Sequence, residues 1–376
     1  MSTLFDYLDW RGDITFNEME PNKLDAAILA HLTYAAFDGL VPENFKETKT
    51  LSQFASDFNK TPDHQTRVKD KFLKNKKTDD ITQQLAVTKR FCDIKLTGYR
   101  NIYNAEKAEQ FAAITYRYDK YTIVAFRGTD DTFAGWHEDF NIGWMDEVPA
   151  ETDAVQYIKD LSKKIKGKLI LTGHSKGGHL AVAVAAKVPF LIRRKIQKVY
   201  NFDGPGFAEK FFKTVQYKRI ESRVEWVYPS ASLVGMIFHH PDNFEIIKAE
   251  GIGAVNQHNI ITWNMKGGDF VHANGFDEGS GFFHKAFNEW FENISHEQRE
   301  KFVKALFDVV EASGVKTLHD FEKSLIVSGV RMITKLNSME KDSKEEVKKI
   351  LKILSDAVKK TARNIEKEKN FKKSKF

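Results

Sequence analysis

The chain has 376 residues, enough to bury a large core as one α/β domain or as two smaller ones. Its net charge of +6 belongs to the end of the chain, since 13 Lys and Arg but only 6 Asp and Glu lie between Lys341 and Phe376. No basic patch interleaved with aromatic residues precedes that tail, which argues against nucleic-acid binding, and the single cysteine, Cys92, excludes an intramolecular disulfide.

The N-terminal segment MSTLFDYLDWRGD lacks a basic region followed by an apolar stretch, so we expect no secretory signal. No apolar run reaches the roughly 18 residues that a membrane span needs. A cytoplasmic protein is therefore expected, with signal-independent export as the alternative.

The first predicted elements are a helix and a hairpin. Residues 22–37 place apolar side chains at helical spacing, which predicts a helix on the core. Residues 61–88 are polar and rich in lysine, which is typical of a surface helix or a loop. Residues 111–126 alternate in polarity and turn at Asp119 and Lys120, which predicts a β-hairpin whose second arm is apolar enough for a central strand.

The middle of the chain alternates between helices and strands. We expect helices at 153–167 and 179–188 and strands at 168–173, 198–204 and 223–229. This order predicts an α/β fold with a mostly parallel sheet covered by helices on both faces. Ligands of such sheets bind at the carboxyl ends of the strands, so the functional residues should follow these strands directly.

The sequence becomes helical beyond about Phe282. We therefore divide the chain into an α/β domain (1–281) and a helical C-terminal extension with a basic tail (282–376). Capping boxes at Ser295 and Ser343 predict the starts of two helices. The last helix combines an apolar stripe with a lysine-rich face, and three interpretations stay open: contact with a membrane surface, packing on the domain, or binding of a partner.

The sequence GHSKGG stands between the strand predicted at 168–173 and the helix that follows it. A G-x-S-x-G motif in this setting is typical of a nucleophile elbow, in which a strained turn exposes the serine hydroxyl. Gly173 and Gly177 permit the close backbone approach, and the helix aims its N-terminal N–H groups at the developing oxyanion. The motif therefore predicts Ser175 as a nucleophile, with a structural glycine-rich loop as the alternative.

Residues 124–140, VAFRGTDDTFAGWHEDF, follow the central strand and turn at Gly128. The sequence FRGT, followed by Trp136 and Asp139 and then by GHSKGG, resembles the class-3 lipases. The chain is more similar still to an uncharacterised bacterial family of lipase-like α/β-hydrolases, over about residues 4 to 270. The segments that carry this similarity are YLDWRGD, LTYAAFDG, KRF, QFAAITY, NFDGPGF and SLVGMI.

The resemblance implies an α/β-hydrolase fold and an acyl-ester hydrolase with Ser175 as its nucleophile. One oxyanion donor would be the backbone N–H of Lys176, and Thr129, just after the FRG turn, would supply the other. The segment Asp130–Trp144 would correspond to the lid of the class-3 lipases.

The general base has to be a histidine. His258 lies in a predicted loop before an apolar stretch and matches the position of the family's histidine, so we assign it this role. His239 and His240 form an adjacent pair without further ligands at a metal-binding spacing, and no metal site is expected. The other histidines after the elbow are His179, His272 and His284.

The acid is the least determined member of the triad. Class-3 lipases carry an aspartate after the strand that here reads RVEWVYP, and Ser232 stands at that position. Asp203 in NFDGPG is the nearest replacement, and it keeps the chain order of serine, acid and histidine. Asp242 is the second candidate, and a structural turn role for Asp203 is the alternative.

These features predict a serine esterase or lipase, including a phospholipase A-type enzyme, that works through an acyl-Ser175 intermediate and needs no cofactor. Its substrate would be an acyl ester or a lipid. The alternative is a weakly active or inactive hydrolase-like scaffold that binds an acylated ligand or a partner protein, an interpretation suggested by Ser232. The head group and the acyl chain length stay open.

Overall fold

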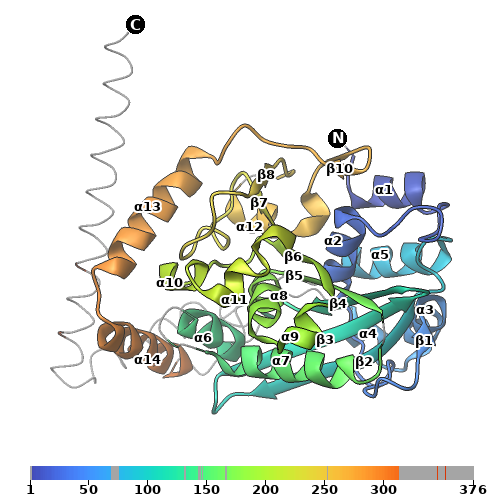
Figure 1. The fold of residues 1–376 in the computed structure, drawn as a ribbon, viewed down its shortest axis with the longest axis horizontal. Helices are drawn as coiled ribbons and strands as arrows, with labels where there is room; N and C mark the ends of the chain where they lie inside the picture. The colour runs from blue at the N-terminus through green and yellow to red at the C-terminus, as the bar shows by residue number, and fades with distance from the viewer. Residues whose placement is uncertain are drawn as a thin grey trace, which may run out of the picture.

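The computed structural model describes residues 2–312, apart from 69–75, 131–132, 143–144, 146, 166 and 252, together with residues 345 and 352. An eight-stranded sheet runs through the centre of the molecule (Figure 1). Its strands are β1 (Lys49–Thr50), β2 (Lys95–Asn104), β3 (Glu109–Tyr118), β4 (Tyr121–Phe126), β5 (Lys168–His174), β6 (Ile196–Phe202), β7 (Val224–Pro229) and β8 (Glu245–Ile247). A separate two-stranded sheet pairs β9 (Met265–Lys266) with β10 (Asp269–Phe270).

The helices lie before, between and after these strands. They are α1 (Leu4–Arg11), α2 (Lys23–Leu32), α3 (Leu51–Lys60), α4 (His64–Arg67), α5 (Lys76–Val87), α6 (Phe133–Asn141), α7 (Pro149–Ser162), α8 (Lys176–Lys187), α9 (Phe190–Arg193), α10 (Glu209–Phe212), α11 (Val215–Lys218), α12 (Ala254–His258), α13 (Glu278–Glu292) and α14 (His296–Ala312). Two short 3₁₀ helices are η1 (Glu221–Arg223) and η2 (Ile260–Thr262).

The strand order in the large sheet follows the order in the chain. Strands β1 to β4 pair antiparallel, and β4 to β8 pair parallel. Helices α6 and α7 connect β4 to β5, and α8 connects β5 to β6, as expected for parallel crossovers. The prediction of an α/β fold with a mostly parallel sheet is therefore confirmed, and strands β1 and β2, which were not predicted, extend the antiparallel edge beyond the predicted hairpin.

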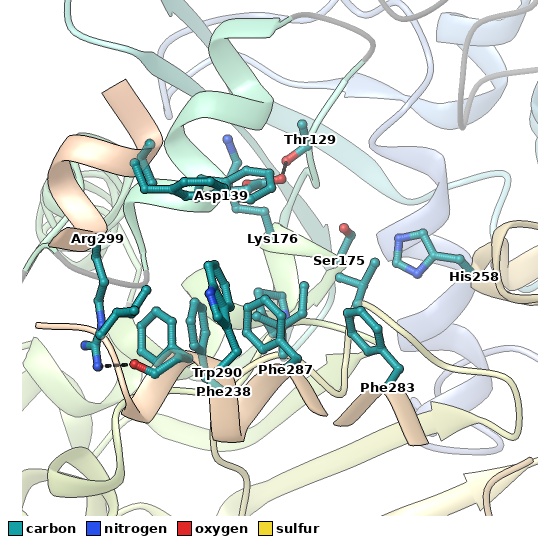
Figure 2. Close-up of a pocket in the computed structure, with 18 residues that line it drawn as sticks. Thr129, Asp139, Ser175, Lys176, Phe238, His258, Phe283, Phe287, Trp290 and Arg299 are labelled. Carbon is teal, nitrogen blue, oxygen red and sulfur yellow. Dashed lines mark hydrogen bonds between the residues drawn. The ribbon is translucent and has the colours of Figure 1, made fainter. Parts of the chain in front are cut away.

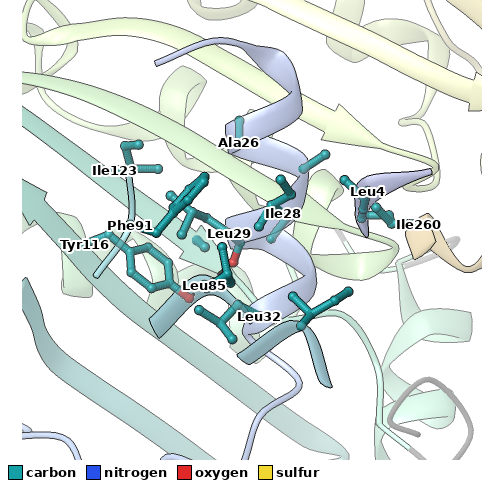
Figure 3. Close-up of a cluster of buried hydrophobic side chains, with 14 of the residues drawn as sticks. Leu4, Ala26, Ile28, Leu29, Leu32, Leu85, Phe91, Tyr116, Ile123 and Ile260 are labelled. Carbon is teal, nitrogen blue, oxygen red and sulfur yellow. Dashed lines mark hydrogen bonds between the residues drawn. The ribbon is translucent and has the colours of Figure 1, made fainter. Parts of the chain in front are cut away.

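Both faces of the sheet are covered, because the strands alternate between two cores. On β4, Ile123 and Ala125 belong to the core under α2, whereas Val124 and Phe126 belong to the core under α7 and α8. Figure 3 shows the first core, where side chains of α2 lie over the sheet beside Tyr116 and Ile123. The buried sheet thus holds the carboxyl ends of β4, β5 and β6 in a rigid frame.

Most predicted elements are present. The helix expected within 22–37 is α2, the hairpin at 111–126 is β3 and β4, and the polar segment 61–88 contains α4 and α5. Strand β2 was not predicted, because an irregularity between Thr97 and Arg100 shifts its pairing with β3 and breaks its alternation. Strand β8, with three residues, is too short to show a period.

Helices α13 and α14 lie at one side of the molecule (Figure 1). The capping box predicted at Ser295 is present: its N–H donates to Oε1 of Gln298 at 2.9 Å, and its hydroxyl accepts from the Gln298 N–H at 3.2 Å. Trp290 and Ile294 form a small core of their own. The helix predicted to start at Ser343 lies outside the described residues, and the division at residue 281 stays a prediction. None of the helices described has the length and hydropathy of a membrane span.

Candidate active site

Ser175 occupies a sharp turn between β5 and α8. Its backbone has φ 57° and ψ −134°, a region that non-glycine residues rarely adopt because it is strained. A Cβ on Gly173 would overlap the backbone of Gly177, and a Cβ on Gly177 would overlap the carbonyl of Phe126. The turn thus has the strand–turn–helix geometry of a nucleophile elbow, and the two glycines permit it.

His258 and Asp203 form a buried hydrogen-bonded pair. Nδ1 of His258 lies 2.6 Å from Oδ2 of Asp203, and the two residues are 5% and 0% exposed. A carboxylate only accepts, so Nδ1 carries the proton and Nε2 keeps its lone pair when the ring is neutral. His258 and Ser175 line the same pocket, where their side chains lie next to each other (Figure 2).

The second oxygen of Asp203 is held by the loop after β7. Its Oδ1 accepts hydrogen bonds from the hydroxyl of Ser232 and, at 3.2 Å, from the N–H of Gly235. The turn that follows is held instead by Asn201, whose Oδ1 accepts from the N–H of Gly204 at 2.8 Å. The carboxylate of Asp203 is therefore free for His258, while Asp242 is exposed.

Other histidines after the elbow have structural partners. The ring of His179 lies between Oε1 of Glu151 and the carbonyl of Gly206, at 3.0 Å from each. Nδ1 of His284 is 2.8 Å from the carbonyl of Met236.

One group of side chains within the described ranges could in principle hold a metal ion: Glu245, Asp269 and His272. The ammonium group of Lys23 already lies 2.7 Å from Glu245 and 3.0 Å from Asp269. Because this ammonium pairs with both carboxylates, the group is accounted for as an ion-pair cluster.

The two predicted oxyanion donors lie at the pocket with Ser175. The N–H of Lys176 is the first in α8, and the N–H of Thr129 follows the turn after β4. Within the described part of the chain, neither N–H donates a hydrogen bond to another group. Both are therefore available to an oxyanion that forms next to Ser175.

The side chain of Lys176 fastens α6 to the elbow. Its ammonium donates to Oε2 of Glu138 at 2.7 Å and to the carbonyl and side-chain oxygens of Gln110 at 2.7 and 2.9 Å. The other oxygen of Glu138 accepts from the N–H of Ala150 at 2.9 Å. Both charged side chains are fully buried, so separating them would leave an uncompensated charge at a cost of about 3–5 kcal/mol. Helix α6 is thus anchored to the elbow at Glu138.

Asp139, which sequence analysis noted without a role, orients Thr129. The Thr129 hydroxyl donates to Oδ2 of Asp139 at 2.5 Å. The other carboxylate oxygen of Asp139 is buried without a hydrogen-bond partner. Burial raises the pKa of Asp139 from 3.8 to about 6, although Lys176 and the Thr129 hydroxyl act in the opposite direction.

Because the pKa of Asp139 is raised, replacing Asp139 with a neutral residue should stabilise the protein, and the gain in stability should depend on pH. Between pH 3.8 and about 6 the folded protein binds more protons at Asp139 than the unfolded chain, so this group's contribution to stability falls as pH rises. At pH 8 we expect Asp139→Asn to raise the free energy of unfolding by up to about 3 kcal/mol, and at pH 4 the gain should nearly vanish. Urea denaturation at both pH values measures this difference.

Asp57→Asn is the control for this prediction. The side chain of Asp57 is about half exposed, and its hydrogen bond with Lys49 lowers its pKa, so its neutralisation should bring no gain at pH 8. An equal gain for Asp139→Asn at pH 4 and pH 8 would contradict the assignment of a raised pKa.

An apolar cavity of about 280 Å³ extends from Ser175 toward α13 and α14 (Figure 2). Its lining consists mainly of apolar and aromatic side chains: Phe140, Pro205, Val234, Ile237, Phe238, Phe283, Phe287, Trp290, Phe291, Ile294, Phe302 and Val303. Sequence analysis missed the contribution of α13, although its aromatic residues recur at helical spacing on one face. The two C-terminal helices therefore form a wall of the candidate active site.

A sequence model of the Mbeg1-like family matches residues 85–308, which is more than half of the chain. The chain belongs to the Mbeg1-like family. The Mbeg1-like match includes the elbow, Asp203, His258, α13 and most of α14.

Among solved structures, this Mbeg1-like chain is similar to one described as the crystal structure of M37 lipase. The two share 14% identity and a TM-score of 0.35, over 57% of this chain and 69% of the other. No curated protein sequence matched.

Proposed function

We propose that this protein is a serine hydrolase that cleaves carboxylic esters through an acyl-Ser175 intermediate. The observation that carries the proposal is the buried Asp203–His258 hydrogen bond at the pocket of the strained Ser175. These three side chains follow β5, β6 and β8 in the chain, and α/β folds place their chemistry beyond the carboxyl ends of such strands. A nucleophile, a base and a group that orients the base are the parts that acyl transfer needs.

In the proposed reaction, Nε2 of His258 takes the proton of the Ser175 hydroxyl as the oxygen attacks the ester carbonyl. The carbonyl oxygen becomes an oxyanion that accepts hydrogen bonds from the N–H groups of Lys176 and Thr129. The carbon–oxygen ester bond then breaks, and His258 gives its proton to the leaving alcohol. Water repeats these steps on the acyl-enzyme and releases the acid. Asp203 stabilises the imidazolium throughout.

The lining of the cavity favours a substrate with a long apolar acyl chain. Each buried methylene group contributes about 0.8 kcal/mol, so every additional carbon should improve binding about fourfold until the cavity is full. Lipid esters, including those cleaved by a phospholipase A, have such chains. Contact with a membrane surface through the basic tail is a further prediction about residues outside the described part.

The Asp203–His258 pair supports this enzyme over the scaffold alternative. The scaffold interpretation was suggested by Ser232 in place of an acid, and here Ser232 donates a hydrogen bond to the carboxylate of Asp203. A protein that only binds an acylated molecule has no need for a strained serine beside an oriented imidazole.

Reaction with an active-site phosphonate and hydrolysis of p-nitrophenyl esters test the proposal together. We expect mass spectrometry to find the phosphonate on the peptide that contains Ser175, and the long-chain ester to have a lower KM than the short-chain ester. A protein that neither reacts with the phosphonate nor hydrolyses either ester would be a scaffold instead.

A further inference from the structure

A series of buried hydrogen bonds reaches the candidate site from a part of the chain that precedes the family match. Tyr34 follows α2, and its hydroxyl lies 2.9 Å from Nδ1 of His174, the residue before the nucleophile. Nε2 of His174 lies 2.7 Å from the backbone carbonyl of His258. Tyr34 and His174 are 6% and 1% exposed, so these bonds are shielded from water.

The direction of each hydrogen bond follows from the chemistry of the groups. The carbonyl of His258 can only accept, so Nε2 of His174 carries a proton and donates it. Burial, aided by the nearby His258, lowers the pKa of His174 well below its ordinary value, so the ring is neutral and carries a single proton. Nδ1 is therefore an acceptor, and the Tyr34 hydroxyl is its donor.

The same hydroxyl contacts the loop that carries Thr129. Gly128 lies in that loop, and its backbone packs directly against the oxygen of Tyr34. A Cβ on Gly128 would overlap this oxygen and would also lie 2.6 Å from the carbonyl of His174. Glycine at position 128 is thus what allows the hydroxyl to reach the oxyanion loop and the elbow at once.

We propose that Tyr34 and His174 are positioning residues. They hold the loop of Thr129, the turn at Ser175 and the backbone of His258 in fixed positions relative to one another. This inference rests on the proposed function. The carbonyl of His258 is at the C-terminus of α12, where helical carbonyls lack partners within the helix, and His174 supplies the partner. A backbone held at this point also holds the imidazole against Ser175. A shift of about 1 Å at such a point can cost on the order of 10²-fold in rate.

The first test compares Tyr34→Phe with Tyr157→Phe. Tyr157 is also buried, and its hydroxyl is 2.7 Å from that of Thr115, away from the pocket, so the control loses a comparable buried hydrogen bond. We expect Tyr34→Phe to lower kcat by about 10- to 100-fold with KM within about twofold of wild type. The rate of phosphonate labelling at Ser175 should fall equally, whereas Tyr157→Phe should retain both rates.

The second test uses rescue at His174. His174→Leu removes both hydrogen bonds, whereas the side-chain amide of His174→Gln can still donate to the carbonyl of His258, so glutamine should recover part of the lost labelling rate.

Three results would overturn the inference. Equal labelling rates for Tyr34→Phe and Tyr157→Phe would assign Tyr34 a structural role only. Equal rates for His174→Gln and His174→Leu, at matched melting temperature, would do the same for His174. If the wild-type protein is not labelled at all, the proposed function itself is wrong, and the positioning role is wrong with it.

Discussion

Replacement of Ser175 by alanine is expected to lower kcat for ester hydrolysis by on the order of 10⁴- to 10⁶-fold. The change removes the oxygen that would form the acyl intermediate, while the oxyanion donors and the cavity stay in place. The loss should therefore appear in kcat, with a much smaller change in KM. Initial rates with a p-nitrophenyl ester measure both parameters.

Stability measurements separate this loss from misfolding. The backbone of Ser175 is strained, and the serine side chain contributes no hydrogen bond within the described residues, so Ser175→Ala should unfold near the wild-type temperature. Ser175→Gly should be more stable than wild type by about 1–3 kcal/mol, since glycine relieves the strain. Ser162→Ala, at the end of α7, should retain full activity. A Ser175→Ala variant with more than about a tenth of the wild-type rate would contradict the nucleophile assignment.

Asp203→Asn is expected to lower kcat by on the order of 10⁴-fold. An asparagine amide at this position would donate to Nδ1 of His258 and so stabilise the tautomer with its proton on Nε2. That nitrogen could then no longer accept the proton of Ser175. The fold should tolerate the change, because asparagine has nearly the same shape as aspartate. Steady-state kinetics over a pH series measures the effect.

Two variants show which residue is the acid. Ser232→Ala removes one hydrogen bond to Asp203 but leaves its charge beside His258, so its loss of activity should be far smaller. Asp242→Asn should behave like wild type, because Asp242 is exposed. If Asp242→Asn lost as much activity as Asp203→Asn, the assignment of the acid would be wrong.

The sequence alone could not decide whether Asp203 or Asp242 is the acid. The motif NFDGPG is equally typical of a turn aspartate and of a triad acid. In the folded chain, Asn201 holds the turn, while Ser232 and Gly235 hold the carboxylate that contacts His258. Ser232 and Gly235 come from the loop after β7, and their position beside Asp203 depends on the pairing of β6 with β7.

The cavity is a second feature that the sequence alone could not predict. The aromatic face of α13 could be recognised from its spacing, but the surface that it covers could not, and the C-terminal helices were assigned to a separate extension. Phe238, from the loop after β7, lies 6.0 Å from Phe287 and 5.0 Å from Phe291, measured between ring centres. An amphipathic pattern shows that a helix has a buried face, but it does not identify the partner of that face.

The candidate oxyanion donors, Lys176 and Thr129, were implied by the family resemblance, whereas the sequence by itself determined the α/β order and the elbow at Ser175. The determinants of the elbow lie within a few residues of one another: two glycines, a buried strand and a helix N-terminus. Only the tertiary structure decided that Asp203 contacts His258, that α13 and α14 wall the cavity, and that Tyr34 reaches His174. Tyr34 and His174 are 140 positions apart in the chain. Contacts over such separations are set by sheet register and by the packing of α2 on the sheet, which no local pattern encodes.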